Sequence, residues 1–438
     1  MKKLLSNAFS GVSSVMFDNS DGAARLRRNQ LMYNWLEAII TTITTGTYFT
    51  GLMLYFDADE QYISIITSLI SLCGIAQLLS PMLLEKFEKR KTLLISLKSI
   101  YFVLNVAIIM LIPIMPISRG GILTAFFITV LITNLINSVC GAGIYVWHIQ
   151  NVPDSKHSNY FTMVHMGVLL ISYVMAILAG IVVDRYAAGA APYTAFLILR
   201  IFALAISAVE IYLLAKIKES PYKHSETKKS NLGILLLPLR SPKFLKVAFI
   251  YFAHVLISNV CGQYFQYYLL EICKIDFTFI SLCNFIALPV MLIATPVWSK
   301  FVNRMSFKKI LPINIIGIGI ALLFNVFVTP STFYLYILTA IFYNISYPSV
   351  AAIYGYMPFV DMPEENKTSY YSFYSSVALI FAFIGNLVGM LFMTLTSGVS
   401  INIFGAEILN YQYLNIFQSL LFAALTVYTI FVFKEKNV

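Results

Sequence analysis

The sequence predicts an all-α integral membrane protein with twelve transmembrane helices in two pseudo-symmetric six-helix bundles. The first observation is composition: of 438 residues, 59% are hydrophobic and 11% are charged, whereas soluble proteins carry about 25% charged residues. The second is a series of twelve apolar runs, and the third is a cytoplasmic loop pattern that repeats in the two halves of the chain. Together these observations exclude an ordinary soluble protein.

A helix that crosses a bilayer needs about 20 largely apolar residues. The twelve runs that meet this need cover 31–55, 62–84, 93–115, 121–146, 162–183, 193–215, 245–270, 278–299, 309–329, 333–357, 370–396 and 412–433.

Lysine and arginine fix the predicted orientation, because basic residues are retained on the cytoplasmic side. With a cytoplasmic N-terminus, 26 of the 30 basic residues fall in cytoplasmic segments, while three fall outside and Arg200 falls within a span. One missing or extra span would invert every later loop and remove this asymmetry. We therefore predict a multi-pass protein of a bacterial-type cell membrane with both termini in the cytoplasm.

The longest charged connection separates the sixth and seventh spans and divides the chain into parts. We expect a cytoplasmic N-terminal segment at 1–30, an N-terminal bundle at 31–215, a cytoplasmic linker at 216–244, and a C-terminal bundle with a short tail at 245–438. The N-terminal segment lacks the clean apolar run and cleavage site of a signal peptide.

A histidine-rich loop raises the possibility of a metal site. In "NVPDSKHSNYF", residues 151–161, His157 lies beside Asp154, with His148 and His165 flanking the loop. A matching loop, "DMPEENKTSYY", occurs 210 residues later and has no histidine. The histidine spacing is also irregular for zinc. We interpret both loops as structural turns, and expect no cofactor and no metal.

Two short basic turns occupy equivalent places in the two halves. The first, "PMLLEKFEKRK" at 81–91, follows the second span, and the other, "WSKFVNRMSFKK" at 298–309, follows the eighth. Here the sequence resembles the major facilitator superfamily, whose signature turn reads G-x-L-x-D-R-x-G-R-R in both halves. The glycines are replaced in both turns, but the acidic or amide and basic positions fit.

The resemblance implies two bundles that rock about a central cavity and open it alternately to either side of the membrane. It also implies a cytoplasmic charge network at the turns. The expected members are Glu85, Lys86, Arg90, Asn303, Arg304 and Lys308. Asn303 cannot supply a negative charge, and simple topology also explains these basic residues.

Charged groups within spans are costly, at about 2.5–3.5 kcal/mol each on insertion scales. Glu37, Arg200, Glu210 and His254 are the candidates, while Lys98 lies near enough to a span end to reach the interface. We expect Glu37 to carry a proton or to donate a structural hydrogen bond. Arg200 and Glu210 are ten residues apart on one helix, so they cannot pair, and a structural role is favoured for both.

Polar residues recur on spans one, four, seven and ten, which line the cavity in the superfamily. The candidates for substrate binding or coupling are Glu37, Thr41, Asn134, Asn137, His254, Asn259, Gln263 and Asn344. For any one asparagine or threonine, helix packing is the competing role.

We predict a secondary active transporter for a small, amphiphilic organic solute, and no enzyme. Aromatic-rich cavity walls with few charges disfavour a phosphate ester, which would need arginine or lysine. The aromatic residues in question are Tyr264, Phe265, Tyr267, Tyr343, Tyr347 and Tyr354. In addition, a fourth-span motif that is typical of proton-coupled relatives lacks its arginine in this sequence. A lipid flippase and a non-transporting receptor remain alternatives. The expected partners are the solute, the bilayer and a proton or sodium ion, with no nucleic acid, and the expected state is a monomer.

Overall fold

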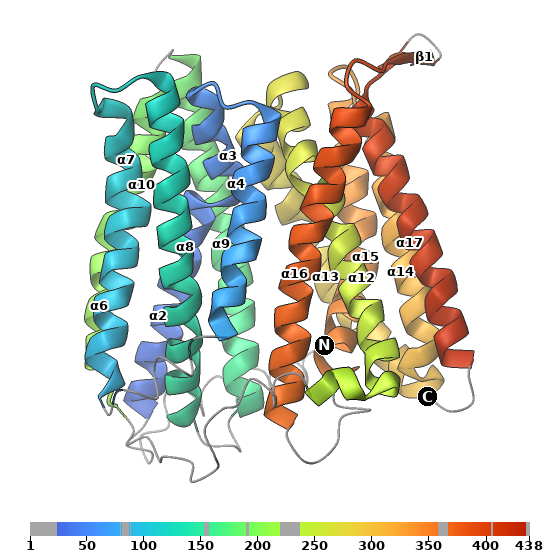
Figure 1. The fold of residues 1–438 in the computed structure, drawn as a ribbon, viewed down its shortest axis with the longest axis horizontal. Coiled ribbons are helices and arrows are strands. Elements are labelled where there is room, and N and C mark those ends of the chain that lie inside the picture. Colours follow the sequence, from blue (N-terminus) through green and yellow to red (C-terminus); the bar gives the residue numbers. More distant parts are fainter. Residues whose placement is uncertain are drawn as a thin grey trace. The chain divides into compact units, whose positions relative to one another are not determined.

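The computed structural model describes residues 24–78, 80, 87, 89–152, 157–189, 192–219, 237–357, 367–403 and 406–434. Almost all of them are helical (Figure 1). The chain divides into two compact units. Unit 1 comprises Met1–Asp57 and Ala76–Thr227, and unit 2 comprises Ala58–Ile75 and Lys228–Val438.

Unit 1 is a bundle of long helices. Its α-helices are α2 (Ala24–Thr44), α3 (Gly46–Tyr55), α6 (Arg90–Phe102), α7 (Ile109–Leu111), α8 (Arg119–Gln150), α9 (His157–Ala188) and α10 (Pro192–Lys216). A π-helical turn, η2 (Val103–Ile108), joins α6 to α7, and the 3-10 turn η3 (Ile112–Ile114) follows. Helix α2 packs against α9 and α10, and α6 packs against α8 and α10.

A buried arginine stabilises two irregular places in this bundle. The first span breaks between α2 and α3, where Gly46 takes a positive φ of 57°, a conformation that glycine adopts at little cost. The guanidinium of Arg200 on α10 donates to the carbonyl oxygens of Thr44 at this break and of Asn105 in η2. Such breaks free backbone carbonyls that need donors within the membrane. Arg200 therefore has the structural role that the sequence favoured.

Unit 2 contains the remaining elements. They are α4 (Glu60–Cys73), η5 (Leu237–Arg240), α12 (Pro242–Tyr267), η6 (Tyr268–Ile272), α13 (Phe277–Met305), α14 (Phe307–Leu323), η7 (Phe324–Phe327), η8 (Phe333–Leu335), α15 (Tyr336–Tyr356), α16 (Lys367–Leu395), β1 (Ile401–Ile403), β2 (Ala406–Ile408) and α17 (Asn410–Lys434). Strands β1 and β2 pair antiparallel, with Ile401 opposite Ile408. This short hairpin is the one departure from an all-α fold in the described residues.

Helices α12 and α14 each pack against several others in unit 2. Helix α12 packs against α16, α17 and α4, while α14 packs against α15 and α17, and α13 packs against α15. Two glycines, Gly385 and Gly389 on α16, place its backbone directly against α12. An added Cβ would lie 2.1 Å from the Leu256 carbonyl oxygen and 2.0 Å from that of Val260. Small residues four apart permit this close approach of helix backbones in membranes.

The expected spans correspond closely to the observed helices. Within the described residues, ten helices are long and apolar enough to cross a membrane, running from Arg90–Ile114 to Asn410–Lys434. The first expected span corresponds to the broken pair α2 and α3. The second corresponds to α4 followed by the 3-10 turn η1 (Gly74–Leu78). The predicted all-α membrane fold is confirmed, although twelve uninterrupted spans are not.

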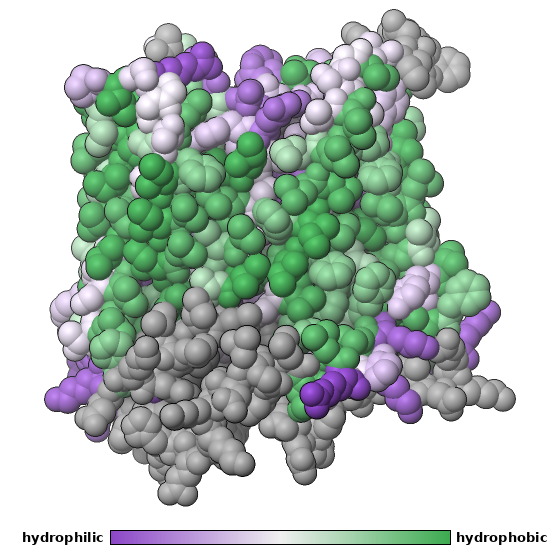
Figure 2. Space-filling view, viewed as in Figure 1, coloured by the Kyte–Doolittle hydropathy of each residue, from purple (hydrophilic) through white to green (hydrophobic). Residues whose placement is uncertain are grey.

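The surface agrees with a membrane environment. Hydrophobic side chains cover the middle of the visible helices, and hydrophilic side chains gather near helix ends (Figure 2). Exposed large hydrophobic residues are found on most of the helices of both units, such as Ile293 at 69% and Phe431 at 65%. In water such a surface would drive aggregation, but lipid chains solvate it without cost.

Candidate functional site

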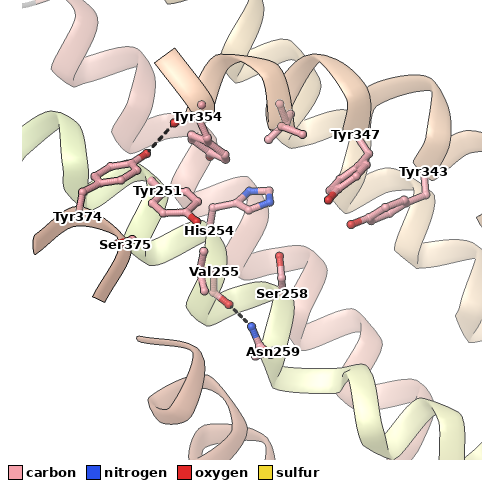
Figure 3. A pocket seen from close by; sticks show the side chains of 13 residues that line it. Tyr251, His254, Val255, Ser258, Asn259, Tyr343, Tyr347, Tyr354, Tyr374 and Ser375 are labelled. Carbon is pink, nitrogen blue, oxygen red and sulfur yellow. Dashed lines mark hydrogen bonds between the residues drawn. The ribbon is translucent and has the colours of Figure 1, made fainter. Parts of the chain in front are cut away.

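A cavity of about 430 Å³ lies within unit 2 (Figure 3). Three helices supply its walls. The lining residues are Tyr251, His254, Val255, Ser258 and Asn259 on α12, then Tyr343, Tyr347, Val350, Ala351, Tyr354 and Gly355 on α15, and Tyr374 and Ser375 on α16.

Helical periodicity explains why these residues share one cavity. The five residues from α12 recur at intervals of three or four positions, which places them on one face of that helix. The α15 residues follow the same spacing from Tyr343 to Gly355. Because the two faces meet across the cavity, the sequence pattern of polar and aromatic residues becomes a single polar and aromatic lining.

Aromatic contacts fix the tyrosines of the lining. Tyr251 stacks on Tyr374 with centroids 4.5 Å apart, and the Tyr374 hydroxyl donates to the Tyr354 carbonyl oxygen at 3.2 Å. Tyr343 and Tyr347 stack with centroids 5.3 Å apart. Figure 3 shows the rings of this pair on one side of the cavity and the imidazole of His254 facing the space between them and Tyr354.

The polar groups of the lining are neutral hydrogen-bonding groups. His254 is 6% exposed, and its ring lies edge-on to Tyr354 and Phe422 with centroids 5.0 and 5.2 Å away. Within the described residues, the Nδ1 atom of His254 and the Tyr354 hydroxyl have no hydrogen-bond partner. Asn259 donates one amide hydrogen to the Val255 carbonyl oxygen at 2.8 Å, and its side chain retains a second donor hydrogen and an acceptor oxygen.

Charge is missing from this set of groups. None of the described residues that line the cavity is Asp, Glu, Lys or Arg. A buried charged ligand without a partner would pay a large desolvation cost. The lining therefore suits a ligand with aromatic or apolar surface and a few neutral hydrogen-bonding groups.

A second polar cluster lies in unit 1 and contains Glu37. The Lys98 ammonium on α6 lies 2.8 Å from Glu37 Oε1 on α2 and 3.9 Å from Glu210 Oε1 on α10. The side chains of Lys98 and Glu210 are 3% and 0% exposed, and that of Glu37 is 24% exposed. The expectation that Lys98 reaches the membrane interface is wrong, because two carboxyl groups on neighbouring helices hold its ammonium inside the bundle.

The other predicted substrate-binding residues are divided between the units. In unit 1, Thr41 donates to the Glu37 carbonyl oxygen at 2.8 Å and Asn134 donates to the Val130 carbonyl oxygen at 2.8 Å, while Asn137 is half-buried on α8. These bonds within one helix leave substrate contact untested, and the roles of all three residues stay predictions.

In unit 2, the structure brings His254 and Asn259 together in the cavity but not the other two candidates. Gln263 is buried and donates to the Ser64 hydroxyl on α4 at 3.4 Å. Asn344 donates to the Ala340 carbonyl oxygen at 2.9 Å and does not belong to the cavity lining.

The cytoplasmic basic turns are only partly described. Glu85 and Lys86 lie outside the described residues, as does the side chain of Asn303. Arg304 is exposed at the end of α13, and the Lys308 ammonium lies 5.9 Å from the centroid of the Phe433 ring. Their part in a gating network stays a prediction.

Arg90 begins α6, where an acid from after α10 caps the helix. Glu219 Oε1 accepts from the backbone N–H groups of Arg90 at 2.6 Å and Lys91 at 3.1 Å. A carboxylate at a helix N-terminus is stabilised by the free N–H groups and the helix dipole. Glu219 is thus an acidic group at this turn that the sequence analysis did not single out, because it lies in a different loop.

The histidine-rich loop itself is outside the described residues at 153–156, but His148 is described. It is buried at the end of α8, beyond the apolar span Arg119–Tyr145, with its ring edge-on to Tyr33 at 5.0 Å. Burial lowers the pKa of His148 to about 3, so this histidine is neutral. Among the described residues, no three His, Cys, Asp or Glu side chains are grouped so that they could hold a metal ion.

Sequence reasoning missed several lining residues. Tyr251 precedes His254 by three positions on the same helix face, so helical spacing could have identified it. Tyr374 and Ser375 come from α16, and no local pattern connects that helix with α12. Lys98 and Glu210 were weighed separately, since only the fold brings α6 and α10 together around Glu37.

Comparison with known proteins identifies the family. The family model of the major facilitator superfamily matches residues 32–386, and no curated protein sequence matches the chain. A mutant of the nucleoside transporter NupG is similar in structure, with a TM-score of 0.71, 13% identity, and coverage of 93% of this chain and 100% of that one.

Two further solved structures share the fold. A bacterial homologue of the iron transporter ferroportin in an inward-facing state has a TM-score of 0.65 and 14% identity, and covers 94% of this chain and 98% of that one. The POT family transporter PepTSo has a TM-score of 0.64 and 12% identity, with coverage of 95% and 98%. Identities this low establish the fold alone. The extent of the family match is decisive, and the chain belongs to the major facilitator superfamily.

Proposed function

We propose that the protein is a secondary active transporter that moves a small, amphiphilic organic solute across the cell membrane by rocker-switch alternating access. Proteins of this superfamily are membrane transporters of small molecules, which supports transport as the activity. The observation that favours this class of solute is the uncharged, tyrosine-rich cavity of unit 2.

The lining favours particular chemical features in the solute. Tyrosine faces at Tyr343 and Tyr347 offer stacking surface to a flat or apolar group. His254, Ser258 and Asn259 offer neutral donors and acceptors on the α12 side. A phosphate ester would instead need arginine or lysine, which pair with phosphate oxygens. Strong, saturable transport of sugar phosphates would therefore contradict the proposal.

The first test is thermal unfolding of the purified protein against panels of metabolites, lipids and antimicrobial compounds. A ligand at a hundredfold excess over its Kd stabilises the folded state by about 2.7 kcal/mol. Tyr347→Ala should abolish the shift, since this side chain is 40% exposed and lines the cavity. Tyr334→Ala is the matched control, because Tyr334 is 55% exposed and outside the lining.

The second test is uptake of each stabilising compound into proteoliposomes. Saturable uptake that Asn259→Ala weakens would support the proposal. If only lipids stabilise the protein and are translocated, the protein is a lipid flippase and the small-solute proposal fails. If compounds bind but none crosses the membrane, the protein is a receptor and the transport proposal fails.

A further inference from the structure

The cluster of Glu37, Lys98 and Glu210 has an unbalanced charge. The three side chains come from α2, α6 and α10 of unit 1 and meet within hydrogen-bonding distance at Lys98 and Glu37. With all three groups ionised, two negative charges face one positive charge in a site that is nearly closed to solvent. A buried net charge costs several kcal/mol, so the cluster favours any arrangement that makes it neutral.

The oxygen atoms of the two carboxyl groups support the same conclusion. In the described residues, Glu37 Oε2 and both oxygens of Glu210 are buried without a partner at ordinary hydrogen-bond geometry. The Tyr33 hydroxyl is the O–H donor within reach of Glu210, and it carries no charge. The two carboxyl groups nevertheless lie within hydrogen-bonding reach of each other. Two ionised carboxylates would repel at this distance, whereas one shared proton makes one group a donor and the other an acceptor.

We propose that Glu37 and Glu210 form a carboxyl pair that binds one proton, with Lys98 as its counter-ion, and that this site couples solute movement to proton movement. The coupling part rests on the proposed transport function. Proton binding by the pair does not, because it follows from the charges and contacts of unit 1 alone.

The groups around the two carboxyl groups do not bring a second positive charge into contact with them. Tyr33 on α2 lies within hydrogen-bonding reach of Glu210 as a neutral donor, and Cys140 on α8 lies near the same cluster. On α6, Tyr101 packs against Lys98, whose ammonium lies 4.6 Å from the ring centroid. Arg200 on α10 is bound to the carbonyl oxygens of Thr44 and Asn105. Neutral tyrosine and thiol groups leave the charge of the pair uncompensated.

A proton fits this site better than a metal cation does. The ammonium of Lys98 lies within 4 Å of both carboxyl groups, at 2.8 Å from Glu37 and 3.9 Å from Glu210, and it would repel a second cation there. Hard cations also need about six oxygen ligands, which two carboxyl groups do not provide. The unequal exposure of the two carboxyl groups indicates the route, because Glu37 is the more accessible member and Glu210 is sealed. The proton therefore enters and leaves through Glu37.

Difference infrared spectroscopy tests proton binding directly in the purified full-length protein without any solute. Spectra near neutral pH should contain the carbonyl stretch of a buried protonated carboxyl group, and the band should vanish at high pH. Glu210→Gln and Glu37→Gln should each remove the band. Glu271→Gln should keep it, since Glu271 is a 40% exposed carboxylate paired with Lys274 outside the cluster.

Two results would overturn proton binding by the pair. One is the lack of a protonated carboxyl band in the wild-type protein at neutral pH. The other is a band that survives unchanged in both glutamine variants. Because the wild-type spectrum is informative by itself, poor folding of a variant would still leave the proposal testable.

Coupling is tested in proteoliposomes with a solute found in the binding screen. A pH gradient should drive wild-type accumulation of the solute, and Glu37→Gln should abolish accumulation while exchange of solute continues. If accumulation follows a sodium gradient instead, the coupling part is overturned. If no solute crosses but the infrared band behaves as expected, the transport function fails and the proton site stands.

Discussion

Lys98 is the residue on which the unit 1 cluster depends, because it is the cation beside two buried carboxyl groups. Lys98→Met should lower the free energy of unfolding by about 3–5 kcal/mol, since removing one partner leaves buried charge uncompensated. The loss should shrink as pH is lowered, because protonation neutralises the carboxyl groups. Denaturant unfolding in detergent at several pH values measures both effects.

The control for this change is Lys274→Met. Lys274 pairs with Glu271 at 2.6 Å, but its side chain is 67% exposed. Exposed pairs contribute about 0–1 kcal/mol, so the variant should unfold almost like the wild type. Equal losses at Lys98 and Lys274 would contradict the importance of burial.

His148 should make stability depend on pH. Its pKa is lowered from 6.5 to about 3 by burial, so below about pH 6.5 the unfolded chain binds a proton that the folded protein excludes. Stability should therefore fall as the pH decreases, by about 1.4 kcal/mol from this group at about pH 5.5. Unfolding of His148→Leu between about pH 7.5 and pH 5.5 should show a smaller loss than the wild type.

The exposed His165 provides the matched control for this measurement. His165→Leu should leave the pH dependence unchanged. If His148→Leu and the wild type lose the same stability, then His148 is protonated or solvated in the folded protein, contrary to its buried position.

At single residues, the sequence identified candidates but could not identify their partners. Glu37 was singled out because a carboxyl group within an apolar span is costly, and the structure places it in a charged cluster. The position of Lys98 near a span end predicted the membrane interface instead. Its burial depends on the packing of α6 against α10, which no pattern within one helix reveals.

At the level of elements, the contact of α16 with α12 depends on two glycines. Gly385→Ala and Gly389→Ala should each lower the free energy of unfolding by about 1–3 kcal/mol, because the new methyl group overlaps a backbone carbonyl and the helices must separate. The measurement is thermal unfolding of each variant in the same detergent.

Gly262 on α12 is the control, since an added Cβ there meets no atom within 4 Å. Gly262→Ala should be neutral or stabilise by about 0.5–1 kcal/mol, because alanine favours the helix. Destabilisation of equal size at all three glycines would show that loss of flexibility, and not overlap, causes the effect.

Helix positions were predictable, but irregularities within helices were not. Apolar runs of about 20 residues located every long helix, with ends that differ from the observed ones by as many as seven residues, as at Ala24 of α2. The break between α2 and α3 and the π-helical turn η2 lie inside apolar runs, and the π-helical turn η6 overlaps the end of another. At the first break and at η2, the backbone carbonyl oxygens accept hydrogen bonds from Arg200 on α10. A pattern within one helix cannot reveal a donor that comes from another helix.

For the whole molecule, the predicted orientation can be tested by labelling. Single cysteines should replace Lys274 and Arg304 in a variant whose five native cysteines are changed to serine. A membrane-impermeant thiol reagent should label Lys274→Cys in intact cells and Arg304→Cys only after the membrane is opened. Both side chains are exposed in the structure, so burial does not hinder either reaction.

Labelling of both positions from outside would contradict the predicted loop between the eighth and ninth spans. Reversed labelling would place the termini outside the cell. The count of basic residues supports neither result, because it assigns 26 of 30 to the cytoplasm.

Sequence order predicted two bundles divided at a charged linker, and this division remains a prediction. The structural units differ from it in one segment, because Ala58–Ile75 belongs to unit 2 although its flanking residues belong to unit 1. Hydropathy counts spans in order along the chain. It contains no information on which distant helix a given span will contact.

The position of α4 also has a consequence for how the protein is made. Glu60 accepts a hydrogen bond from Tyr411, 351 residues later, and Ser64 is bonded to Gln263, 199 residues later. During synthesis α4 therefore enters the membrane long before its partners exist. Unit 2 cannot be completed until α17 has left the ribosome, so chains truncated before α17 should retain an unmatched polar face on α4 that quality-control proteases can recognise.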